Sequence, residues 1–126
     1  VRLDCAVSDS AKTFEYLLDG IAARYERDNA ILPLFAAVAH TTKELLEEYP
    51  GNYNYLLTNG WVLFAFSNHR QFVLLKGSKN LERCLLLTTV AQGLSPESWV
   101  RVSRQRESGG VLMAILGSDI LLKADI

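Results

Sequence analysis

The chain has 126 residues, of which 49% are hydrophobic and 21% are charged, and it contains two histidines. A single domain of this length buries roughly two thirds of the surface that its unfolded chain exposes, so the composition is sufficient for one apolar core. The net charge of -1 argues against a surface that binds nucleic acid or an anionic membrane. No apolar run reaches the ~18 residues of a membrane span. A content of two histidines argues against an ordinary zinc site.

The cysteine content favours a reducing compartment. Cys5 and Cys84 lie far apart and form neither a C-x-x-C pair nor a metal-ligand spacing. We therefore expect two reduced thiols in a cytoplasmic protein rather than a disulfide. No signal peptide is visible, but the sequence begins with Val1 rather than Met, which leaves open a processed or truncated piece whose targeting signal lay upstream.

The first helix is predicted to begin at Ser8, after a short strand or extended arm over residues 1–7. The Ser8 hydroxyl can accept a hydrogen bond from an unpaired backbone N–H, and Asp9 then lies in the first turn, where the helix dipole favours a carboxylate. The pattern continues to about residue 28, although Gly20 weakens it. One apolar face is expected at helical spacing from Phe14, Leu17, Leu18, Ile21 and Ala22.

A second helix is predicted from about Asn29 to Glu48. Pro33 falls in its first turn, where a missing backbone N–H costs little, and Pro50 and Gly51 end it. Its apolar stripe consists of Leu34, Phe35, Val38, Ala39, Thr42, Leu45 and Leu46.

After Gly51 the hydrophobic period changes from helical to strand-like. NYNYLL and WVLFAF form a predicted hairpin around Asn59-Gly60, because Asn-Gly supplies the positive φ values of a tight turn. Further strands are expected at residues 71–76, 83–90, 98–103, 110–116 and 119–124.

The order of elements predicts an α+β fold, with two helices packed on a largely antiparallel sheet of about six or seven strands. Several strands are apolar on both faces, most clearly RCLLLTTV at residues 83–90. Such strands need a second covering layer. We expect a partner chain or a missing half to supply it.

Three ordered motifs resemble one enzyme family. The first is SDS at residues 8–10, the second is NYLLTNG at residues 54–60, and the third is LLLTT at residues 85–89 followed by Trp99. Together they look like the C-terminal half of a class II glutamine amidotransferase domain. The branch they resemble most is the stand-alone one, which contains gamma-glutamyl hydrolases.

The resemblance implies a four-layer αββα sandwich of the N-terminal-nucleophile hydrolase type. In that family a cysteine at the mature N-terminus attacks the side-chain amide of glutamine or a gamma-glutamyl compound, and its own α-amine acts as the base. An Asn-Gly element supplies the oxyanion hole, and Arg and Asp hold the substrate. No metal or organic cofactor is implied.

Asp9 is the one substrate-binding residue that the resemblance carries over to this chain. It matches the aspartate of the family's (T/S)DSE motif, which would bind the α-ammonium of the glutamine or gamma-glutamyl group. The alternative is a first-turn aspartate that only stabilises its helix, by ~0.5 kcal/mol. Ala11 stands where the family has Glu, so the reciprocal capping box is lost.

The family's nucleophile has no counterpart here, so no catalytic residue is expected in this chain. Residue 1 is Val, and the amine of Cys5 is locked in a peptide bond. We expect Cys5 and Cys84 to be buried and to pack as small apolar side chains. The expected partner is an upstream half or a companion subunit, or else a second copy of this chain. The alternative function is a non-catalytic α+β binding or scaffolding module.

The remaining polar residues have simpler interpretations than catalysis. Asn59-Gly60 is expected to be a turn rather than an oxyanion hole, and the Asn54 amide to pin neighbouring backbone. His69 and Arg70 are expected to be surface loop residues, with contact to a ligand or partner as the alternative, and His40 is expected to be a half-exposed residue of the second helix. We expect five basic residues to lie along a solvated strand edge, where their charges oppose pairing with other strands, rather than to form a phosphate site. They are Lys76, Lys79, Arg101, Arg104 and Arg106.

Overall fold

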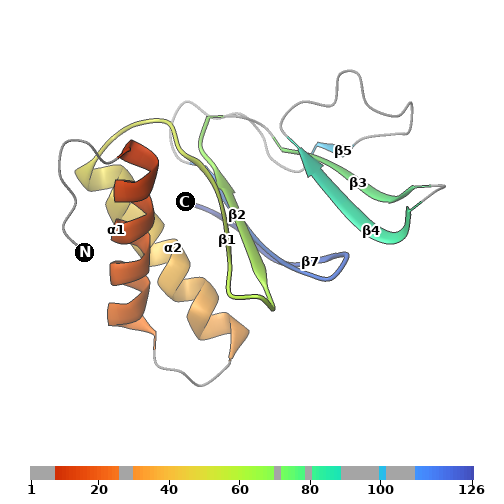
Figure 1. Ribbon diagram of the computed structural model, residues 1–126, viewed down its shortest axis with the longest axis horizontal. Helices are drawn as coiled ribbons and strands as arrows, with labels where there is room; N and C mark the ends of the chain where they lie inside the picture. Colours follow the sequence, from red (N-terminus) through yellow and green to blue (C-terminus); the bar gives the residue numbers. More distant parts are fainter. Residues whose placement is uncertain (1–7, 26–29, 70–71, 79–80, 89–99, 102–109) are drawn as a thin grey trace. The chain divides into compact units, whose positions relative to one another are not determined.

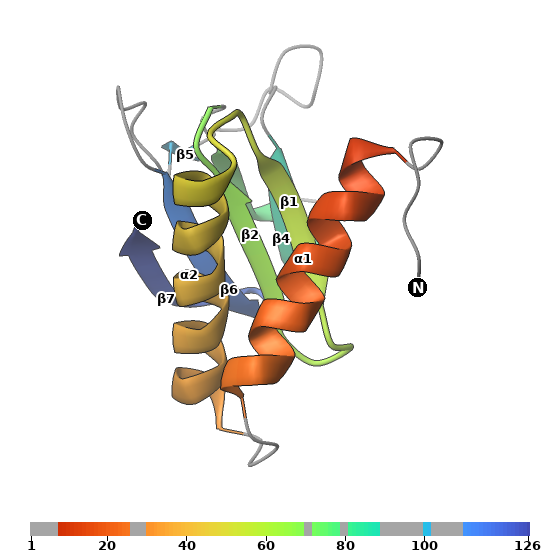
Figure 2. The same ribbon diagram turned by 90° about the vertical axis from the view of Figure 1, so that its left-hand side faces the viewer.

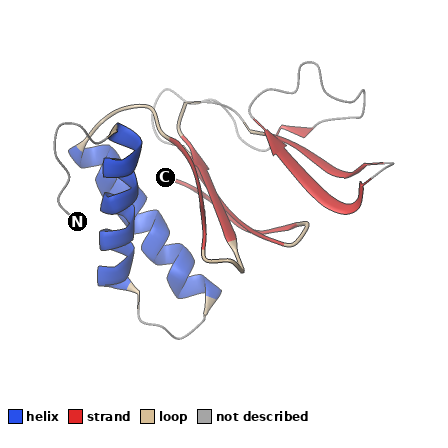
Figure 3. Ribbon diagram, in the orientation of Figure 1, coloured by secondary structure: helices blue, strands red, loops and turns tan. Residues whose placement is uncertain are grey.

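The structure, a computed structural model, describes residues 8–25, 30–69, 72–78, 81–88, 100–101 and 110–126. Two helices come first and strands follow, as Figures 1 and 3 show. The chain divides into two compact units, Val1–Gly51 and Asn52–Ile126. The elements are α1 (Asp9–Arg24), α2 (Ile31–Glu48), β1 (Asn54–Thr58), β2 (Leu63–Ser67), β3 (Val73–Ser78), β4 (Leu81–Thr88), β5 (Val100–Arg101), β6 (Val111–Leu116) and β7 (Asp119–Asp125).

Helix α1 begins where its capping residue predicts. Ser8 has an extended backbone, and its side-chain oxygen accepts a hydrogen bond from the backbone N–H of Ala11 at 3.3 Å. This bond satisfies one of the N–H groups that the first helical turn leaves unpaired. The helix ends at Arg24, whose guanidinium donates to the Gly20 carbonyl at 3.1 Å. Residues 1–7, for which a strand or arm was expected, lie outside the described residues.

Helix α2 lacks a side-chain cap at its N-terminus, whereas a backbone hydrogen bond and a proline define its C-terminus. Its N-cap is Ala30, which provides no side-chain hydrogen bond, and Pro33 is in the first turn as predicted. At the other end the Tyr49 backbone N–H donates to the Leu45 carbonyl at 2.8 Å. Pro50 follows directly, and it has no N–H with which to continue the helix.

The two helices of the first unit run antiparallel and cross closely (Figure 2). At the crossing a Cβ added to Gly20 would lie 2.4 Å from Cγ2 of Thr41, so only a glycine fits there. Arg24 forms an ion pair with Glu44 across the same helices. The buried residues of this unit are Leu17, Leu34, Ala37, Val38, Thr41, Thr42 and Leu45.

The apolar face predicted for α1 is only partly buried. Leu17 is 2% exposed, whereas Phe14 is 52% and Leu18 is 44% exposed. The predicted apolar face is therefore covered at Leu17 and open at Phe14 and Leu18.

A four-stranded antiparallel sheet forms the larger part of the second unit, with strand order β1-β2-β6-β7. The predicted α+β order of two helices followed by an antiparallel sheet is thus confirmed. Strands β1 and β2 form the expected hairpin, and the pair Thr58 and Leu63 closes a loop of four residues, longer than a tight turn. The rings of Tyr55 and Phe66, a cross-strand pair, lie 5.4 Å apart between centroids.

The central strands of this sheet are buried on both faces. Residues 64–67 of β2 and 111–115 of β6 are all buried. Because successive side chains of a strand point to opposite faces, such runs require cover on both faces. Strands β1 and β7, at the edges, alternate between exposed and partly buried residues.

One face of the sheet carries a compact apolar cluster. It is formed by Ala65, Val111, Met113, Phe72 and the partly buried Ile120. Ala65 and Met113 are direct cross-strand partners.

Strands β4, β3 and β5 form a second antiparallel sheet in that order. Strand β3 pairs with both of its neighbours, and its register with β4 shifts between Lys76 and Ser78. The predicted strands at residues 83–90 and 98–103 overlap β4 and β5, and their remaining residues fall outside the described part of the chain.

Candidate functional site

Asp9 lies in the first turn of α1, and its side chain is exposed. The Ser8 cap and the Lys12 N–H, which donates to the Ser8 carbonyl at 3.2 Å, fix the backbone on either side of it. Within the residues that the structure describes, the Asp9 carboxylate has no hydrogen-bond or ion-pair partner. It therefore presents an unused negative charge at the positive end of a helix dipole, where a carboxylate is stabilised.

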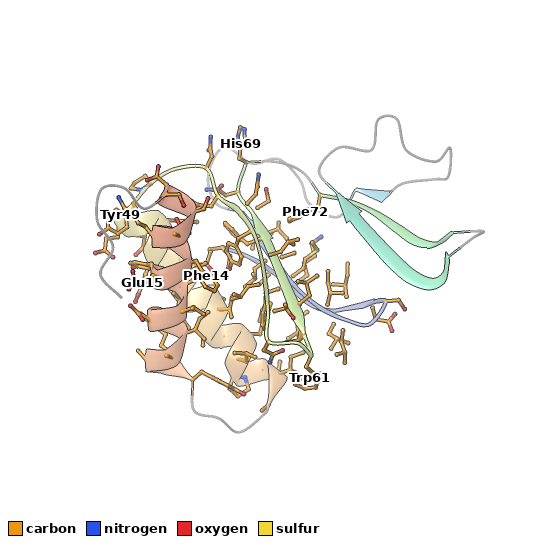
Figure 4. All side chains as sticks on the ribbon, viewed as in Figure 1. Phe14, Glu15, Tyr49, Trp61, His69 and Phe72 are labelled. Atoms are coloured by element: carbon orange, nitrogen blue, oxygen red, sulfur yellow. The ribbon has the colours of Figure 1, made fainter. Side chains whose placement is uncertain are left out.

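A second polar contact joins α1 to the C-terminal end of α2. The Tyr16 hydroxyl donates to Oε2 of Glu48 at 2.7 Å, and its ring meets that of Tyr49 edge-on at 5.9 Å (Tyr49 is labelled in Figure 4). The hydrogen bond to Glu48, then burial, then the charges of Glu48 and Glu44 raise the pKa of Tyr16 to about 12. Tyr16 is therefore a neutral donor, not a base, at physiological pH.

A polar cluster, formed by Tyr53, Asn54, Ser67 and Asn68, joins the start of β1 to the end of β2. The buried Ser67 hydroxyl donates to Oδ1 of its cross-strand partner Asn54. The Tyr53 N–H donates to Oδ1 of Asn68 at 2.7 Å, and the Asn68 N–H donates to the Tyr53 carbonyl at 3.2 Å. These bonds close the open end of the hairpin.

The cluster corrects one sequence-based expectation. Asn54 was expected to pin neighbouring backbone, but the bond found for its amide oxygen is with a side chain, that of Ser67. Asn68, which the sequence did not single out, holds the backbone instead. An asparagine directly after a strand is a turn signal, and that signal was available in the sequence.

Asn59 and Gly60 lie in the connection of the β1–β2 hairpin, as expected, although this connection is a four-residue loop rather than a tight turn. Gly60 has a φ of 90°, which favours glycine. Its N–H donates to Oγ1 of Thr58 at 3.0 Å, and Oδ1 of Asn59 accepts from the N–H groups of Trp61 and Val62 at 2.9 and 3.0 Å. These N–H groups are used inside the turn, so the prediction of a structural role rather than an oxyanion hole agrees with the geometry.

For the described part of the chain, no hydrogen bond or ion pair joins another candidate residue to Asp9. His69 is exposed, as expected of a surface loop residue (it is labelled in Figure 4), and His40, expected to be half-exposed, is exposed. Among the described residues no group of His, Cys, Asp and Glu side chains is arranged to hold a metal ion, and no helix is long and apolar enough to cross a membrane. Cys5, Arg70, Lys79, Arg104 and Arg106 lie outside the described residues; Lys76, Cys84 and Arg101 lie in β3, β4 and β5.

Comparisons with known proteins leave the family resemblance untested. No protein-family model matches the chain, no curated protein is detectably similar to it, and no solved structure matches its fold.

Proposed function

We propose that this chain is the C-terminal part of a class II glutamine amidotransferase-like domain, which cleaves the amide of glutamine or a gamma-glutamyl compound. Three ordered sequence motifs support the proposal. The observation that carries it in the structure is Asp9, an exposed carboxylate at the start of a helix capped by Ser8, for which the described residues provide no hydrogen-bond or ion-pair partner. A ligand's ammonium group can reach such a carboxylate and form a charge-assisted hydrogen bond with it.

The thiol of this reaction would come from polypeptide outside this chain. Its thiolate attacks the amide carbon, the α-amine on the same residue takes and returns the proton, and ammonia leaves before water releases the acid. Asp9 takes no part in the proton transfers. Its role is to hold the substrate's α-ammonium group, so that the amide lies in a fixed position relative to the thiol.

Exposed apolar residues also support an assembly larger than this chain. Phe14 and Leu18 on α1, Leu56 on β1 and Leu121 on β7 are between 44% and 65% exposed. Phe14 and Leu18 are four residues apart on α1 and share one helix face, an exposed apolar surface that suits packing against another polypeptide. We propose that the upstream half of the domain, whether the same or a companion polypeptide, covers it.

The test is glutaminase activity of the complete gene product carrying Asp9→Asn. The substitution keeps the shape of the side chain and removes its charge. We expect kcat/KM to fall about tenfold or more, mainly through KM, because a hydrogen bond to a charged group contributes about 1.5–3 kcal/mol.

Ser8→Ala is the matched control, since it removes the cap and leaves the carboxylate. It is expected to lower the free energy of unfolding by about 1 kcal/mol with little change in KM. Equal KM values for Asp9→Asn and the unmodified protein would show that Asp9 only stabilises its helix. A complete gene product with no amidase activity at all would favour the binding or scaffolding module.

A further inference from the structure

We propose that Asn59 is a site of spontaneous covalent modification, at which its side-chain amide is lost as ammonia through attack by the Gly60 backbone nitrogen. The N–Cγ bond that forms closes a five-membered succinimide, while the Cγ–Nδ2 bond breaks and the leaving nitrogen takes up a proton. Water then opens the ring to aspartate or isoaspartate. One water is consumed, one ammonia is released and nothing is oxidised or reduced.

The turn leaves the attacking nitrogen accessible. Asn59 and Gly60 are both exposed, and, apart from Gly60 and its two chain neighbours, no atom lies within 4 Å of the position that a Gly60 Cβ would occupy. Glycine has no Cβ to shield its nitrogen. Asn59 is also the one asparagine in the sequence that precedes a glycine; Asn52, Asn54 and Asn68 precede tyrosine or histidine, whose side chains crowd the nitrogen.

The hydrogen bonds of the turn favour the addition step. Oδ1 of Asn59 accepts from two backbone N–H groups, those of Trp61 and Val62. Negative charge develops on this oxygen when Cγ is attacked, and fixed donors stabilise such a charge. The Gly60 N–H donates to the Thr58 hydroxyl rather than to the strand ladder, so its deprotonation breaks no bond between β1 and β2.

The two products have different effects on the hairpin. An aspartate at this position keeps an oxygen that accepts from Trp61 and Val62 and changes the net charge from -1 to -2. Isoaspartate instead inserts one extra carbon into the main chain. The strand register depends on the length of the loop, so this product is expected to disturb the pairing of Thr58 with Leu63.

The experiment is incubation of the full 126-residue chain in mildly alkaline buffer, followed by peptide mass mapping and an isoaspartate-specific methylation assay. We expect a gain of about one dalton at Asn59 before any other asparagine changes, with isoaspartate among the products. Asn59→Gln lengthens the side chain and removes the five-membered route, so the mass gain and the methylation signal should disappear.

A second variant, Gly60→Ala, places a Cβ beside the attacking nitrogen and should slow the conversion severalfold. Its circular dichroism spectrum checks that the sheet is retained. Persistence of unmodified Asn59 while another asparagine converts would overturn the proposal. An unchanged mass gain in Asn59→Gln would overturn it as well.

Discussion

At the scale of single residues, the contact between Gly20 and Thr41 determines how closely α1 and α2 approach. Gly20 weakens the helix that contains it, since glycine is about 1 kcal/mol less favourable than alanine in a helix interior. The structure explains why a glycine stands here: the Cβ of any other residue would clash with Thr41, which is fully buried. The Thr41 hydroxyl finds no hydrogen-bond partner in the described part of the chain, so this close contact also has a polar cost.

Gly20→Ala is therefore expected to lower the free energy of unfolding, despite the gain in helix propensity. The new Cβ would lie 2.4 Å from Cγ2 and 3.0 Å from Oγ1 of Thr41, a β-branched residue with restricted rotamers. Overpacking of this kind costs about 1–3 kcal/mol. Urea unfolding measures the change.

The control for this prediction is a double-mutant cycle with Thr41→Ala, which removes both clashing atoms. In that background Gly20→Ala should cost less than in the unmodified chain. A Gly20→Ala variant more stable than the unmodified protein would contradict the assigned contact.

Tyr16 gives a prediction about pH. Its pKa is raised from about 10 to about 12, mainly by the hydrogen bond to Glu48, so the folded state binds the phenol proton more tightly than the unfolded state does. The resulting stability is complete below pH 10 and is lost as the pH rises through about 12. Tyr16→Phe should consequently destabilise the protein below pH 10, and the difference should vanish above pH 12.

The measurement is the titration of the Tyr16 ring-carbon resonance, assigned with Tyr16→Phe. Glu48→Gln is the matched variant, because it removes the charge and retains an oxygen that can accept the bond. The pKa of Tyr16 should fall back toward 10 in Glu48→Gln. An unshifted titration in the unmodified protein would show that the contact does not persist in solution.

At the scale of elements, the β1–β2 hairpin and β6 are joined by backbone contacts that only a glycine permits. Gly110 precedes β6, and a Cβ there would lie 2.6 Å from the Ser67 carbonyl oxygen and 2.8 Å from Cα of Asn68. Gly110 also exchanges two backbone hydrogen bonds with Ile126, at 2.8 and 3.1 Å, which extend the pairing of β6 with β7.

Gly110→Ala is expected to destabilise the sheet by about 3 kcal/mol, at the upper end of overpacking costs, because the clashing atoms are backbone and cannot rotate away. Gly117→Ala is the control. Gly117 has a φ of 60° and no atom within 4 Å of the added Cβ, so it should cost only the backbone strain, about 1–2 kcal/mol.

Thermal and urea unfolding of both variants test this difference. Equal losses in the two variants would mean that β2 moves to accommodate a side chain at Gly110. The hydrogen bonds of Asn68 to Tyr53, which hold this end of β2, argue against such movement.

At the scale of the whole molecule, apolar surface is the feature with a direct experimental consequence. Phe14 and Leu18 expose about half of their surface on α1. We expect the isolated chain to self-associate with increasing concentration, as light scattering would detect. Phe14→Ser with Leu18→Ser should reduce this association, whereas Trp61→Ser, in the hairpin loop, should change it less.

A monodisperse monomer at all accessible concentrations would contradict this prediction. It would also remove one of the supports for an upstream half that covers α1. The substitutions change exposed residues, so unfolding curves that match those of the unmodified chain are the check that folding is preserved.

The sequence by itself determined the local structure. Ser8 and Asp9 mark the start of α1, Pro33 lies in the first turn of α2 and Pro50 follows its end, and Asn59-Gly60 marks the hairpin loop, as the structure confirms. Each of these signals acts on backbone atoms within a few residues, through a hydrogen bond, a fixed φ or a missing N–H.

Only the tertiary structure decided which side chains are covered and which polar groups meet. It exposed Phe14 and Leu18, brought Tyr16 to Glu48, and assigned the backbone-holding role to Asn68 rather than Asn54. These outcomes depend on contacts between residues 13 to 32 positions apart or on how closely two helices approach. Periodicity identifies the apolar residues of a helix, but the neighbouring element decides which of them it buries.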